Sequence, residues 1–349
     1  MEGYDFEDRP FLVFWEITRS CALACRHCRA AAQPRRHPEE LDSAHALALI
    51  RQLAGWKPPM LVLTGGDPLM RRDALDLVRA AADSGLHVGL SPSATERLLR
   101  ADFAEIKAAG VRRMSLSLDG ATRESHDAFR GIAGTFDRTL EAVRRSHEAG
   151  LDLQINTTLT RGNLGEYEDF KRLMFTLKPA MWSVFLLVPT GRAALDDLPE
   201  PEEIERVFED MADLVGKAPF AVKTTEGHHF RRVVMQKMGG GAARPRPGMR
   251  SPLGIRDGRG VLFISHVGEV SPSGFLPLVC GNVKETHPAE IYRKHPLFVS
   301  LRDNAALGGK CGRCEYRDVC GGSRARAFGA HGDPLAADPA CVHQPKAAA

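Results

Sequence analysis

Three cysteines near the start of the chain are the clearest candidates for chemistry. Cys21, Cys25 and Cys28 have the spacing C-x3-C-x2-C and follow an apolar run at residues 11–17. Three thiolates this close together can hold one face of an iron–sulfur cube and leave its fourth iron without a protein ligand. A structural zinc site usually has four ligands, and His27 would have to fold back between two cysteines to complete one. The spacing therefore favours an open three-cysteine cluster over zinc or unliganded thiols.

A second group of cysteines lies near the end of the chain. Cys311, Cys314 and Cys320 have the spacing C-x2-C-x5-C, and Cys341 follows further on. Four thiols at such spacings indicate a metal site, but zinc and iron–sulfur clusters both use them. The remaining thiol, Cys280, has the default role of a small core residue. The N-terminus is polar and does not read as a secretory signal, so we expect metal ligation in the cytoplasm rather than disulfides.

Length and composition place the chain among ordinary globular proteins. It has 349 residues, of which 43% are hydrophobic and 26% charged, enough for one large domain and a smaller one. A net charge of +3 is too small to argue for nucleic acid as a partner. No apolar run in the sequence approaches the roughly 20 residues of a membrane span. We therefore expect neither nucleic acid nor a membrane among its partners.

The elements that must position the cysteines alternate between short apolar runs and amphipathic helices. This alternation predicts an α/β fold, with a parallel sheet and helices outside it. Such sheets bind ligands at the carboxyl ends of their strands, and the first cysteine loop follows the first strand. Six strand–helix units are fewer than the eight of a closed barrel. The expected strands are 11–17, 60–64, 87–91, 113–118, 152–158 and 182–188, and the expected helices are about 43–54, 72–84, 97–109, 135–149, 164–177 and 202–216.

Glycines and hydroxyl side chains follow the second and third expected strands. Gly65 and Gly66 would let the backbone approach a ligand, and the carboxylate of Asp67 comes next, although a plain turn is the alternative. The hydroxyls of Ser91 and Ser93 could bond a ribose or a carboxylate, or they could serve the cap of the next helix. Each motif has such an ordinary explanation, but their order at successive strand ends favours a common ligand.

The fourth and fifth expected strands carry polar side chains on one face. Polar groups on an inward face cost free energy unless a ligand or water uses them. Pro189 lies in the turn after the sixth strand, on the same expected rim. By period-two alternation, the inward-facing residues are Ser115, Ser117 and Asp119 on the fourth strand and Gln154, Asn156 and Thr158 on the fifth.

The first cysteine loop resembles the signature of the radical S-adenosylmethionine (SAM) superfamily, C-x3-C-x-aromatic-C, with His27 at the aromatic position. The resemblance implies a partial (β/α)6 barrel and a [4Fe-4S] cluster whose open iron is chelated by SAM. It also implies that the reduced cluster cleaves SAM to methionine and a 5′-deoxyadenosyl radical. Asp67 replaces the Glu usual in the family, and Arg130 resembles the arginine that pairs with the SAM carboxylate, with a surface ion pair as the alternative. The cofactor-binding residues so implied are Gly65, Gly66, Asp67, Ser91, Ser93, Ser117, Asp119, Arg130, Asn156, Thr158 and Pro189.

The C-terminal cysteines resemble the SPASM/twitch extensions of radical SAM enzymes. A full SPASM domain holds seven cysteines for two clusters, whereas Ser273 and Ser323-Arg324 stand here where relatives have cysteine. The resemblance implies one auxiliary [4Fe-4S] cluster, fully ligated by Cys311, Cys314, Cys320 and Cys341. The expected division is a radical SAM barrel at 1–215, a linker with a basic, mobile Gly/Pro loop at 216–260, and a small cysteine-rich domain at 261–349 that begins with a hairpin-like run.

Three stretches resemble radical SAM/SPASM proteins of the alternative heme pathway, namely WEITRSCALACRHCRA, GEVSPSGFLPLVCGNV and CGRCEYRDVCGGSRARA. This resemblance implies an anionic tetrapyrrole substrate, hydrogen abstraction from a propionate β-carbon, and loss of CO2 to leave a vinyl group. It also implies an electron donor such as flavodoxin or ferredoxin. Arginines that could pair with the carboxylates are Arg231, Arg232, Arg244, Arg246 and Arg250.

Two alternatives stay open at this point. The same layout serves peptide-modifying maturases, which often carry an N-terminal leader-binding domain, whereas only ten residues precede the first expected strand here. A zinc-holding, non-enzymatic binding module would explain the C-terminal thiols, but it would need no glycine-rich loop after the second strand. The adjacent His228 and His229 would face different sides of any regular element, so we do not expect both to bind one metal.

Overall fold

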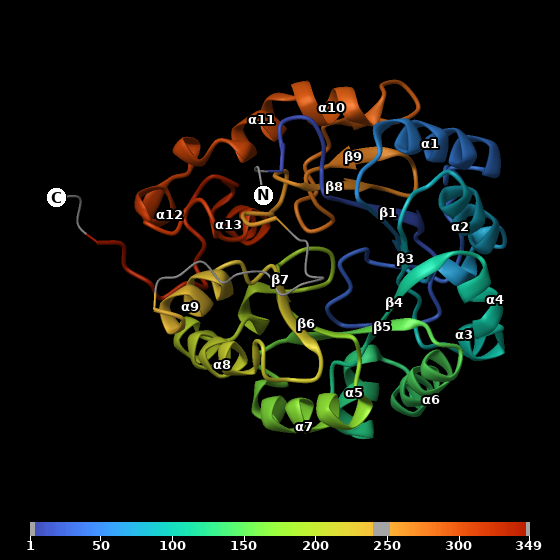
Figure 1. Ribbon diagram of the computed structural model, residues 1–349, viewed down its shortest axis with the longest axis horizontal. Helices are drawn as coiled ribbons and strands as arrows, with labels where there is room; N and C mark the ends of the chain where they lie inside the picture. The colour runs from blue at the N-terminus through green and yellow to red at the C-terminus, as the bar shows by residue number, and fades with distance from the viewer. Residues whose placement is uncertain (1–3, 240–251, 347–349) are drawn as a thin grey trace.

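The computed structural model describes residues 4–239 and 252–346. Within these residues, ten strands form one sheet in the order β10-β9-β8-β1-β2-β3-β4-β5-β6-β7. Figure 1 shows the strands curving around a centre, with most helices outside them. The parallel strands are β1 (Leu12–Thr18), β2 (Met60–Gly65), β3 (Val88–Leu90), β4 (Val111–Ser117), β5 (Asp152–Leu159), β6 (Met181–Leu186) and β7 (Ala221–Thr225). The predicted α/β partial barrel is confirmed, since all six expected strands are present.

Helices connect these strands and cover the outer face of the sheet (Figure 1). The first helix begins at Ser43 because the side chain of Asp42 accepts a hydrogen bond from the His45 N–H at 2.8 Å. Short 3-10 turns occupy Pro68–Met70, Leu164–Glu166 and Leu195–Asp197. The helices are α1 (Ser43–Trp56), α2 (Ala74–Asp83), α3 (Glu96–Arg100), α4 (Phe103–Ala108), α5 (Arg123–Arg130), α6 (Thr135–Glu148), α7 (Tyr167–Leu177), α8 (Pro201–Leu214) and α9 (Phe230–Lys237).

The single helix expected at 97–109 is two short helices, α3 and α4. Ala101 is extended (φ −71°, ψ 150°), and Asp102 follows it. The Asp102 carboxylate accepts hydrogen bonds from the backbone N–H groups of Ala104 and Glu105 at 2.8 and 3.4 Å. An Asp side chain that bonds the next backbone amides starts a new helix instead of continuing the old one. The prediction of one helix was wrong for this reason.

Alternation along β4 separates the hydrophobic core from the inner face of the sheet. Met114 and Leu116 are fully buried in the main core cluster between sheet and helices. Ser115 and Ser117 point to the other side, where they line a central cavity, as the period-two pattern predicts. The barrel therefore buries its apolar residues outward, under the helices, and presents a partly polar inner wall.

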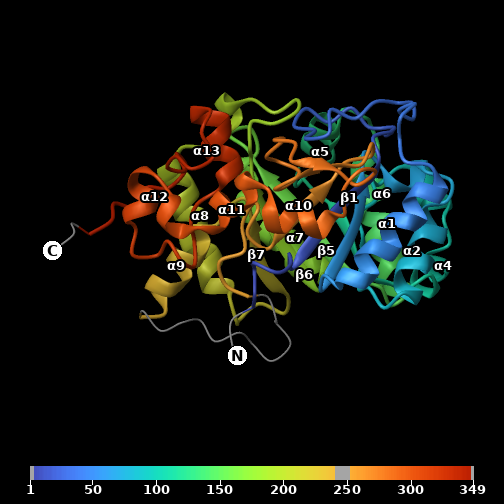
Figure 2. The same cartoon turned by 90° about the horizontal axis from the view of Figure 1, so that it is seen from above.

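The C-terminal part of the chain continues the same sheet. β8 (Val261–Ile264) pairs parallel with β1, with Leu12 opposite Val261. The predicted hairpin-like run is present, since β9 (Glu269–Ser271) pairs antiparallel with β8, and β10 (Gly281–Asn282) follows at the edge. Figure 2 shows the last helices beside the barrel. They are α10 (Pro288–Lys294), α11 (Pro296–Arg302), α12 (Gly309–Arg313) and α13 (Arg324–His331), with a 3-10 turn at Asn304–Ala306.

A fully buried ion pair joins the cysteine-rich end of the chain to the barrel. Arg326 of α13 lies 2.9 Å from Asp338 (Nε to Oδ1), and both side chains are inaccessible to solvent. The same guanidinium donates a hydrogen bond to the backbone oxygen of Leu187, just after β6, at 3.1 Å. The division of the chain at residues 215 and 260 remains a prediction.

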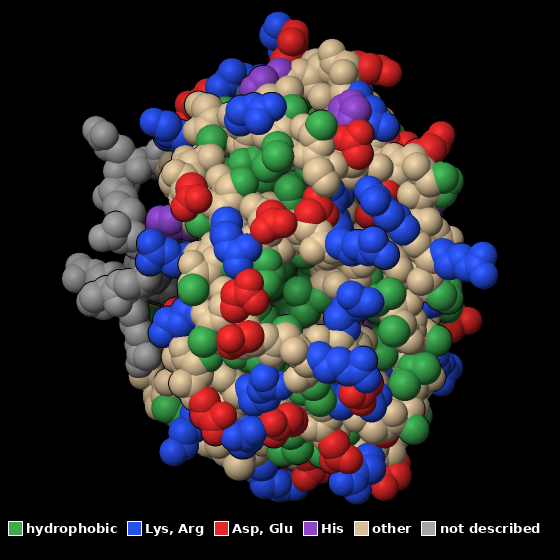
Figure 3. Space-filling model, turned by 90° about the vertical axis from the view of Figure 1, so that its right-hand side faces the viewer, with side chains coloured by type: hydrophobic (Ala, Val, Ile, Leu, Met, Phe, Trp, Pro, Cys, Tyr) green, Lys and Arg blue, Asp and Glu red, His purple; other side chains and the backbone are tan. Residues whose placement is uncertain are grey.

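The outer surface mixes both signs of charge. On the face shown in Figure 3, acidic and basic side chains alternate around small apolar areas. Arg79 of α2, for example, pairs with Asp76 at 3.0 Å and with Glu105 of α4 at 2.6 Å. Among the described helices, none has both the length and the apolar character that a membrane crossing needs.

Candidate functional site

A cavity of about 620 Å³ fills the centre of the barrel. Its wall combines apolar side chains such as Phe14, Phe263 and Phe275 with polar residues from the inner faces of the strands. The three N-terminal cysteines line it together, and they also form one small buried cluster with Leu23 and Ala32. The cysteine loop, expected at the carboxyl end of β1, therefore faces the enclosed volume. The cysteines are Cys21, Cys25 and Cys28.

Hydrogen-bond donors surround the sulfurs of this loop. The Leu23 N–H donates to Cys21 Sγ at 3.3 Å and the Ala32 N–H donates to Cys28 Sγ at 3.4 Å. The guanidinium of Arg130 lies 3.6 Å from Cys25 Sγ. Such donors stabilise thiolates and tune iron–sulfur clusters. The donor set thus fits the predicted cluster.

The Cys21 thiol is protonated in the absence of a metal. Burial raises the pKa of Cys21 to about 11, despite the Leu23 N–H and a contact of 3.7 Å with Ser93 Oγ. A metal ion bound to such a thiol displaces its proton. Cys21 is therefore a neutral thiol by itself, and it would release its proton on binding iron.

Eight of the residues predicted to bind the cofactor line the cavity. They come from the ends of β2 to β5 and from the end of α5, so segments far apart in sequence meet around the cysteine loop. A single ligand bound beside the cysteines could therefore contact these residues. The eight residues are Gly65, Gly66, Ser91, Ser93, Ser117, Arg130, Asn156 and Thr158.

Asp67 lies behind the cavity wall instead of in it. Its carboxylate is fully buried and accepts hydrogen bonds from Leu69 N–H at 3.2 Å, Ser93 N–H at 3.4 Å and Thr95 Oγ1 at 3.1 Å. Burial raises the pKa of Asp67, against these donors. The side chain therefore ties the loop after β2 to the loop after β3, and it positions Ser93 beside Cys21.

Asp119 also lies behind the wall, and it holds two cavity residues in place. Its carboxylate forms an ion pair with Arg130 and accepts a hydrogen bond from the Thr158 N–H at 2.6 Å. Burial opposes the charge, but Arg130 and neighbouring groups lower the pKa of Asp119 overall. Arg130 is thus a buried residue anchored beside Cys25, and its alternative role as a surface ion pair is excluded.

Pro189 packs toward Gly329. A Cβ added at Gly329 would lie 2.5 Å from the ring of Pro189.

His27 stacks obliquely on Phe129, with ring centroids 4.3 Å apart, and lines the cavity between two of the cysteines. Burial lowers the pKa of His27 to about 4, so the ring is neutral near pH 7. Its neighbour across the loop, His126, accepts a hydrogen bond from the Asp119 N–H at 3.1 Å. Both imidazoles therefore add no positive charge beside Cys25 and Cys28.

Two of the five arginines expected to bind carboxylates can be placed. Arg231 lines the cavity, but its guanidinium donates to the backbone oxygens of Val319 and Ile255 at 3.0 and 2.7 Å. Arg232 forms an ion pair with Glu205. Both guanidinium groups therefore already have partners within the protein. The other three, Arg244, Arg246 and Arg250, lie outside the described residues, as does most of the predicted basic loop.

The adjacent histidines face different sites, as the sequence predicts. His228 lines the central cavity, and His229 lines a smaller cavity of about 20 Å³ near the C-terminal cysteines. Burial lowers the pKa of both rings, that of His229 to about 3. One histidine on each site rules out a metal shared between these two rings.

The four C-terminal cysteines surround the smaller cavity. The Asp338 N–H donates to Cys311 Sγ and the Gly322 N–H to Cys320 Sγ, each at 3.4 Å. Burial raises the pKa of Cys320 to about 12, so this thiol too is neutral without a metal. Cys280 lies in the main hydrophobic core, as expected for a leftover thiol. The four cavity thiols are Cys311, Cys314, Cys320 and Cys341.

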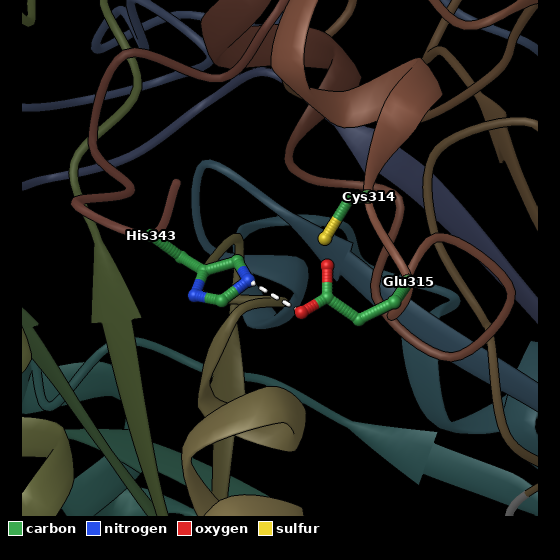
Figure 4. A group of neighbouring side chains, drawn as sticks. All are labelled: Cys314, Glu315 and His343. Atoms are coloured by element: carbon green, nitrogen blue, oxygen red, sulfur yellow. Dashed lines mark hydrogen bonds and ion pairs between the residues drawn. The ribbon is translucent and has the colours of Figure 1, made fainter. Parts of the chain in front are cut away.

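A mixed group of ligands stands at the outer edge of the smaller cavity. Figure 4 shows the Glu315 carboxylate beside the Cys314 sulfur, with His343 bonded to Glu315. The distance from His343 Nε2 to Glu315 Oε1 is 3.1 Å, and one ligand atom of each of the three residues lies within 4.8 Å of the others. Such N, O and S donors also suit zinc. The geometry alone therefore leaves both an iron–sulfur cluster and zinc open at this site.

Sequence reasoning missed two cations on the inner wall. Arg113 stands on β4 two residues before Ser115, and Lys223 stands on β7 two residues before Thr225. Both line the cavity. The period-two pattern that placed Ser115 and Ser117 inside applies to them as well, so the signal was present in the sequence.

Comparison with known proteins gives the family. Residues 15–174 match the Radical SAM superfamily. The AdoMet-dependent heme synthases of Nitratidesulfovibrio vulgaris and Methanosarcina barkeri are 41% and 38% identical to this chain, each over 96% of it and over 93% and 97% of their own lengths. The PqqA peptide cyclase of Rhizobium meliloti is 27% identical, over 96% of this chain and 88% of its own.

The fold agrees with a solved structure. The crystal structure of Streptococcus suis SuiB bound to S-adenosylmethionine has a TM-score of 0.74 at 17% identity, covering 96% of this chain and 78% of that one. Identity over nearly the whole length of the heme synthases, and not the fold alone, decides membership. The protein therefore belongs to the radical SAM superfamily, as an enzyme that uses a [4Fe-4S] cluster and SAM, and its relatives are the AdoMet-dependent heme synthases.

Proposed function

We propose that this enzyme acts on an iron porphyrin with propionate side chains and removes CO2 from a propionate. The observation that carries the proposal is the 41% identity with an AdoMet-dependent heme synthase over almost the full length of both chains. The cavity agrees with it, because about 620 Å³ falls within the size range of pockets for organic ligands and cofactors. The peptide cyclase is more distant, at 27% identity, which favours the tetrapyrrole over a peptide.

In this proposal, Cys21, Cys25 and Cys28 hold the cluster, and SAM lies against the strand ends beside them. The eight cavity-lining residues from Gly65 to Thr158 are its contacts, whereas Asp67 and Asp119 position those contacts from behind. When bound, the cluster and SAM supply a 5′-deoxyadenosyl radical. Arg130, held by Asp119, is the expected partner of the SAM carboxylate.

The chain's own task is to orient the substrate and keep water away from the radical. Phe14, Phe185 and Phe275 give the cavity apolar walls suited to a flat macrocycle. The reaction would balance as follows: the ionised propionate gives one hydrogen atom from its β-carbon to the 5′-deoxyadenosyl radical, which becomes 5′-deoxyadenosine, the C–CO2 bond breaks, and a vinyl group and CO2 form. One electron is released as well, to a one-electron acceptor such as an iron–sulfur cluster.

We further propose that the four C-terminal cysteines hold an auxiliary [4Fe-4S] cluster. Support comes from the backbone N–H groups of Asp338, Gly322 and Tyr316, each 3.4 Å from a cysteine sulfur. Arg324 lies 3.7 Å from Cys311 Sγ and adds a charged donor. Donors of this kind stabilise cysteine thiolates and tune the potential of a bound iron–sulfur cluster. Reduction of the first cluster would need a donor such as flavodoxin or ferredoxin.

The proposal is tested on protein purified without oxygen, reduced, and incubated with SAM and iron coproporphyrin. The expected result is porphyrin-dependent 5′-deoxyadenosine together with loss of CO2 from the macrocycle, read by mass spectrometry. Formation of 5′-deoxyadenosine without any mass loss from the porphyrin would argue against decarboxylation.

Iron and sulfide analysis of the same protein tests the metal content and should give roughly eight irons per chain for two cubes. Zinc at one or two equivalents without sulfide would overturn the assignment as an enzyme and support the zinc-holding, non-enzymatic binding module.

A further inference from the structure

Two cations on the inner wall lack an acidic partner within the described chain. Arg113 reaches only the thioether of Met181, 3.9 Å from its Nη1, and its buried Nε has no hydrogen-bond partner there. Lys223 forms neither a salt bridge nor a hydrogen bond with any described residue. Outside the described ranges the sequence contains a single acid, Glu2. Both cations face the cavity instead.

The surroundings of Lys223 are basic. Burial, together with the positive charges of Arg113 and Arg231, lowers the pKa of Lys223 to about 8. The acids that also line the cavity have other partners: Glu226 accepts from the Ser323 hydroxyl, and Asp257 accepts from the Arg324 N–H at 3.0 Å. Positive charge therefore accumulates on one part of the wall without internal compensation.

Such an arrangement costs stability in the absence of a ligand. Burying an unpaired cation is unfavourable, and an adjacent cation of like charge adds to the cost. Lys and Arg are rarely kept inside a protein without a partner. An anion that enters the cavity would supply the missing partner.

The position of Arg113 separates this site from the cysteine loop. The guanidinium lies beside Met181, the first residue of β6, and hence near the amino ends of the strands. Along β4, Arg113 precedes Ser117 by four residues, about 13 Å at the rise of a strand. The cysteine loop lies at the opposite, carboxyl edge. An anion held by Arg113 is therefore remote from the atoms that react.

We propose that Arg113 and Lys223 form a carboxylate-binding site that holds a propionate which does not react in that turnover. The inference rests on the proposed function, because it takes the ligand to be a porphyrin with several propionates. A fixed propionate at the amino end of the barrel would direct another edge of the macrocycle toward the cysteine loop. The pair thus acts as a positioning and specificity site for the substrate.

The test compares binding of iron coproporphyrin with binding of its uncharged tetramethyl ester, by absorbance titration without reductant. Arg113→Gln and Lys223→Met should each weaken binding of the tetra-acid about 10- to 100-fold, as expected when a charged hydrogen bond is lost. Binding of the ester should stay within about twofold of wild type. Arg112→Gln is the matched control, because Arg112 is exposed on the outer side of the same strand.

Stability supplies a second readout. Since Lys223 is unpaired within the described chain, Lys223→Met should leave the melting temperature of the ligand-free protein unchanged or raise it. A structural lysine would behave in the opposite way. Lys223→Arg, which keeps the charge, should retain most of the preference for the tetra-acid over the ester.

The outcomes separate the two proposals. Wild-type decarboxylation together with unchanged tetra-acid binding by both Arg113→Gln and Lys223→Met would overturn the carboxylate site and leave the proposed function standing. Equal weakening for tetra-acid and ester would also overturn it. If the wild-type protein binds no iron porphyrin, the substrate class and the carboxylate site fall together.

Discussion

A single carboxylate, that of Asp67, shows how a residue can serve the site without touching its ligand. Its hydrogen bonds to the Ser93 N–H and to Thr95 Oγ1 cross from one strand end to the next. The residue type suggests a direct contact with the cofactor, as the sequence predicts, but its fully buried position suggests support. Sequence alone could identify the motif but not the direction of the side chain, because direction depends on tertiary packing.

Asp67→Ala should therefore destabilise the protein and weaken SAM binding together. Three donors would lose their acceptor, at a cost of about 2–4 kcal/mol in the free energy of unfolding. Urea unfolding and SAM binding by equilibrium dialysis measure the two effects. Asp76→Ala, at an exposed carboxylate on α2, should change neither by a comparable amount. Full stability with lost SAM binding would instead make Asp67 a direct ligand.

The cysteines offer a matched pair at the same scale. Cys21→Ala should abolish SAM cleavage, because two thiolates are too few to hold the open cube. Cys280→Ala should keep it, because Cys280 lies in the core and its thiol makes one described polar contact, a hydrogen bond to the Leu278 oxygen at 3.4 Å. The assay is 5′-deoxyadenosine formed by reduced protein. Activity in Cys21→Ala above that of a SAM blank would contradict the assignment.

Lys223 predicts a pH dependence of substrate binding. With a pKa of about 8, its ammonium is mostly charged at pH 7 and mostly neutral at pH 9, so affinity for the tetra-acid porphyrin should fall between these values. The charged groups that face Lys223 are Arg113 and Arg231. Lys223→Met should show weaker but nearly flat binding, measured by the same titration. A wild-type affinity that does not change from pH 7 to 9 would contradict this role.

At the scale of elements, the loops around α12 and α13 gather four thiols from a stretch with little regular structure. The spacing in the sequence predicts that these cysteines act together, and the smaller cavity brings all four to one place. The carboxylate–imidazole pair beside Cys314 could not be expected from spacing, because Glu315 and His343 meet only through the path of the last loop.

Cys320→Ser should lower iron content from roughly eight to roughly four per chain while uncoupled SAM cleavage continues. The reason is that the two cysteine groups line separate cavities. Iron analysis and 5′-deoxyadenosine formation without substrate are the measurements. His343→Ala serves as a control for the mixed ligand group and should leave iron unchanged. Loss of zinc instead of iron in Cys320→Ser would show that the site holds zinc.

At the scale of the whole molecule, Glu16 joins three distant parts of the chain. From β1, its carboxylate contacts Arg29 of the cysteine loop at 2.9 Å and His266 of the β8–β9 turn at 2.8 Å. Burial opposes its charge, yet Arg29 and His266 lower the pKa of Glu16 overall. The apolar pattern predicts β1, but an acid inside it gives no hint of partners 13 and 250 positions away.

Glu16→Gln should destabilise the protein by about 3 kcal/mol near neutral pH, because Arg29 would lose a buried partner. A carboxylate with a lowered pKa stabilises the fold above its ordinary value of 4.5, and this contribution is lost as pH falls through the folded-state pKa. The gap in urea midpoint between wild type and variant should thus stay constant from pH 7 to about pH 5 and shrink as the pH falls below 4.5. Glu141→Gln, at an exposed pair, should shift the urea midpoint far less than Glu16→Gln does. A gap that does not depend on pH would contradict the role of this charge.

The pairing of β8 with β1 has a consequence for how the protein matures. The strand that leads into the first cysteine loop gains its second neighbour only from residues 261–264. On the ribosome, most of the polypeptide must therefore emerge before the wall behind that loop is complete. The first three cysteines therefore gain their complete surroundings only late in synthesis, once residues 261–264 can pair with β1.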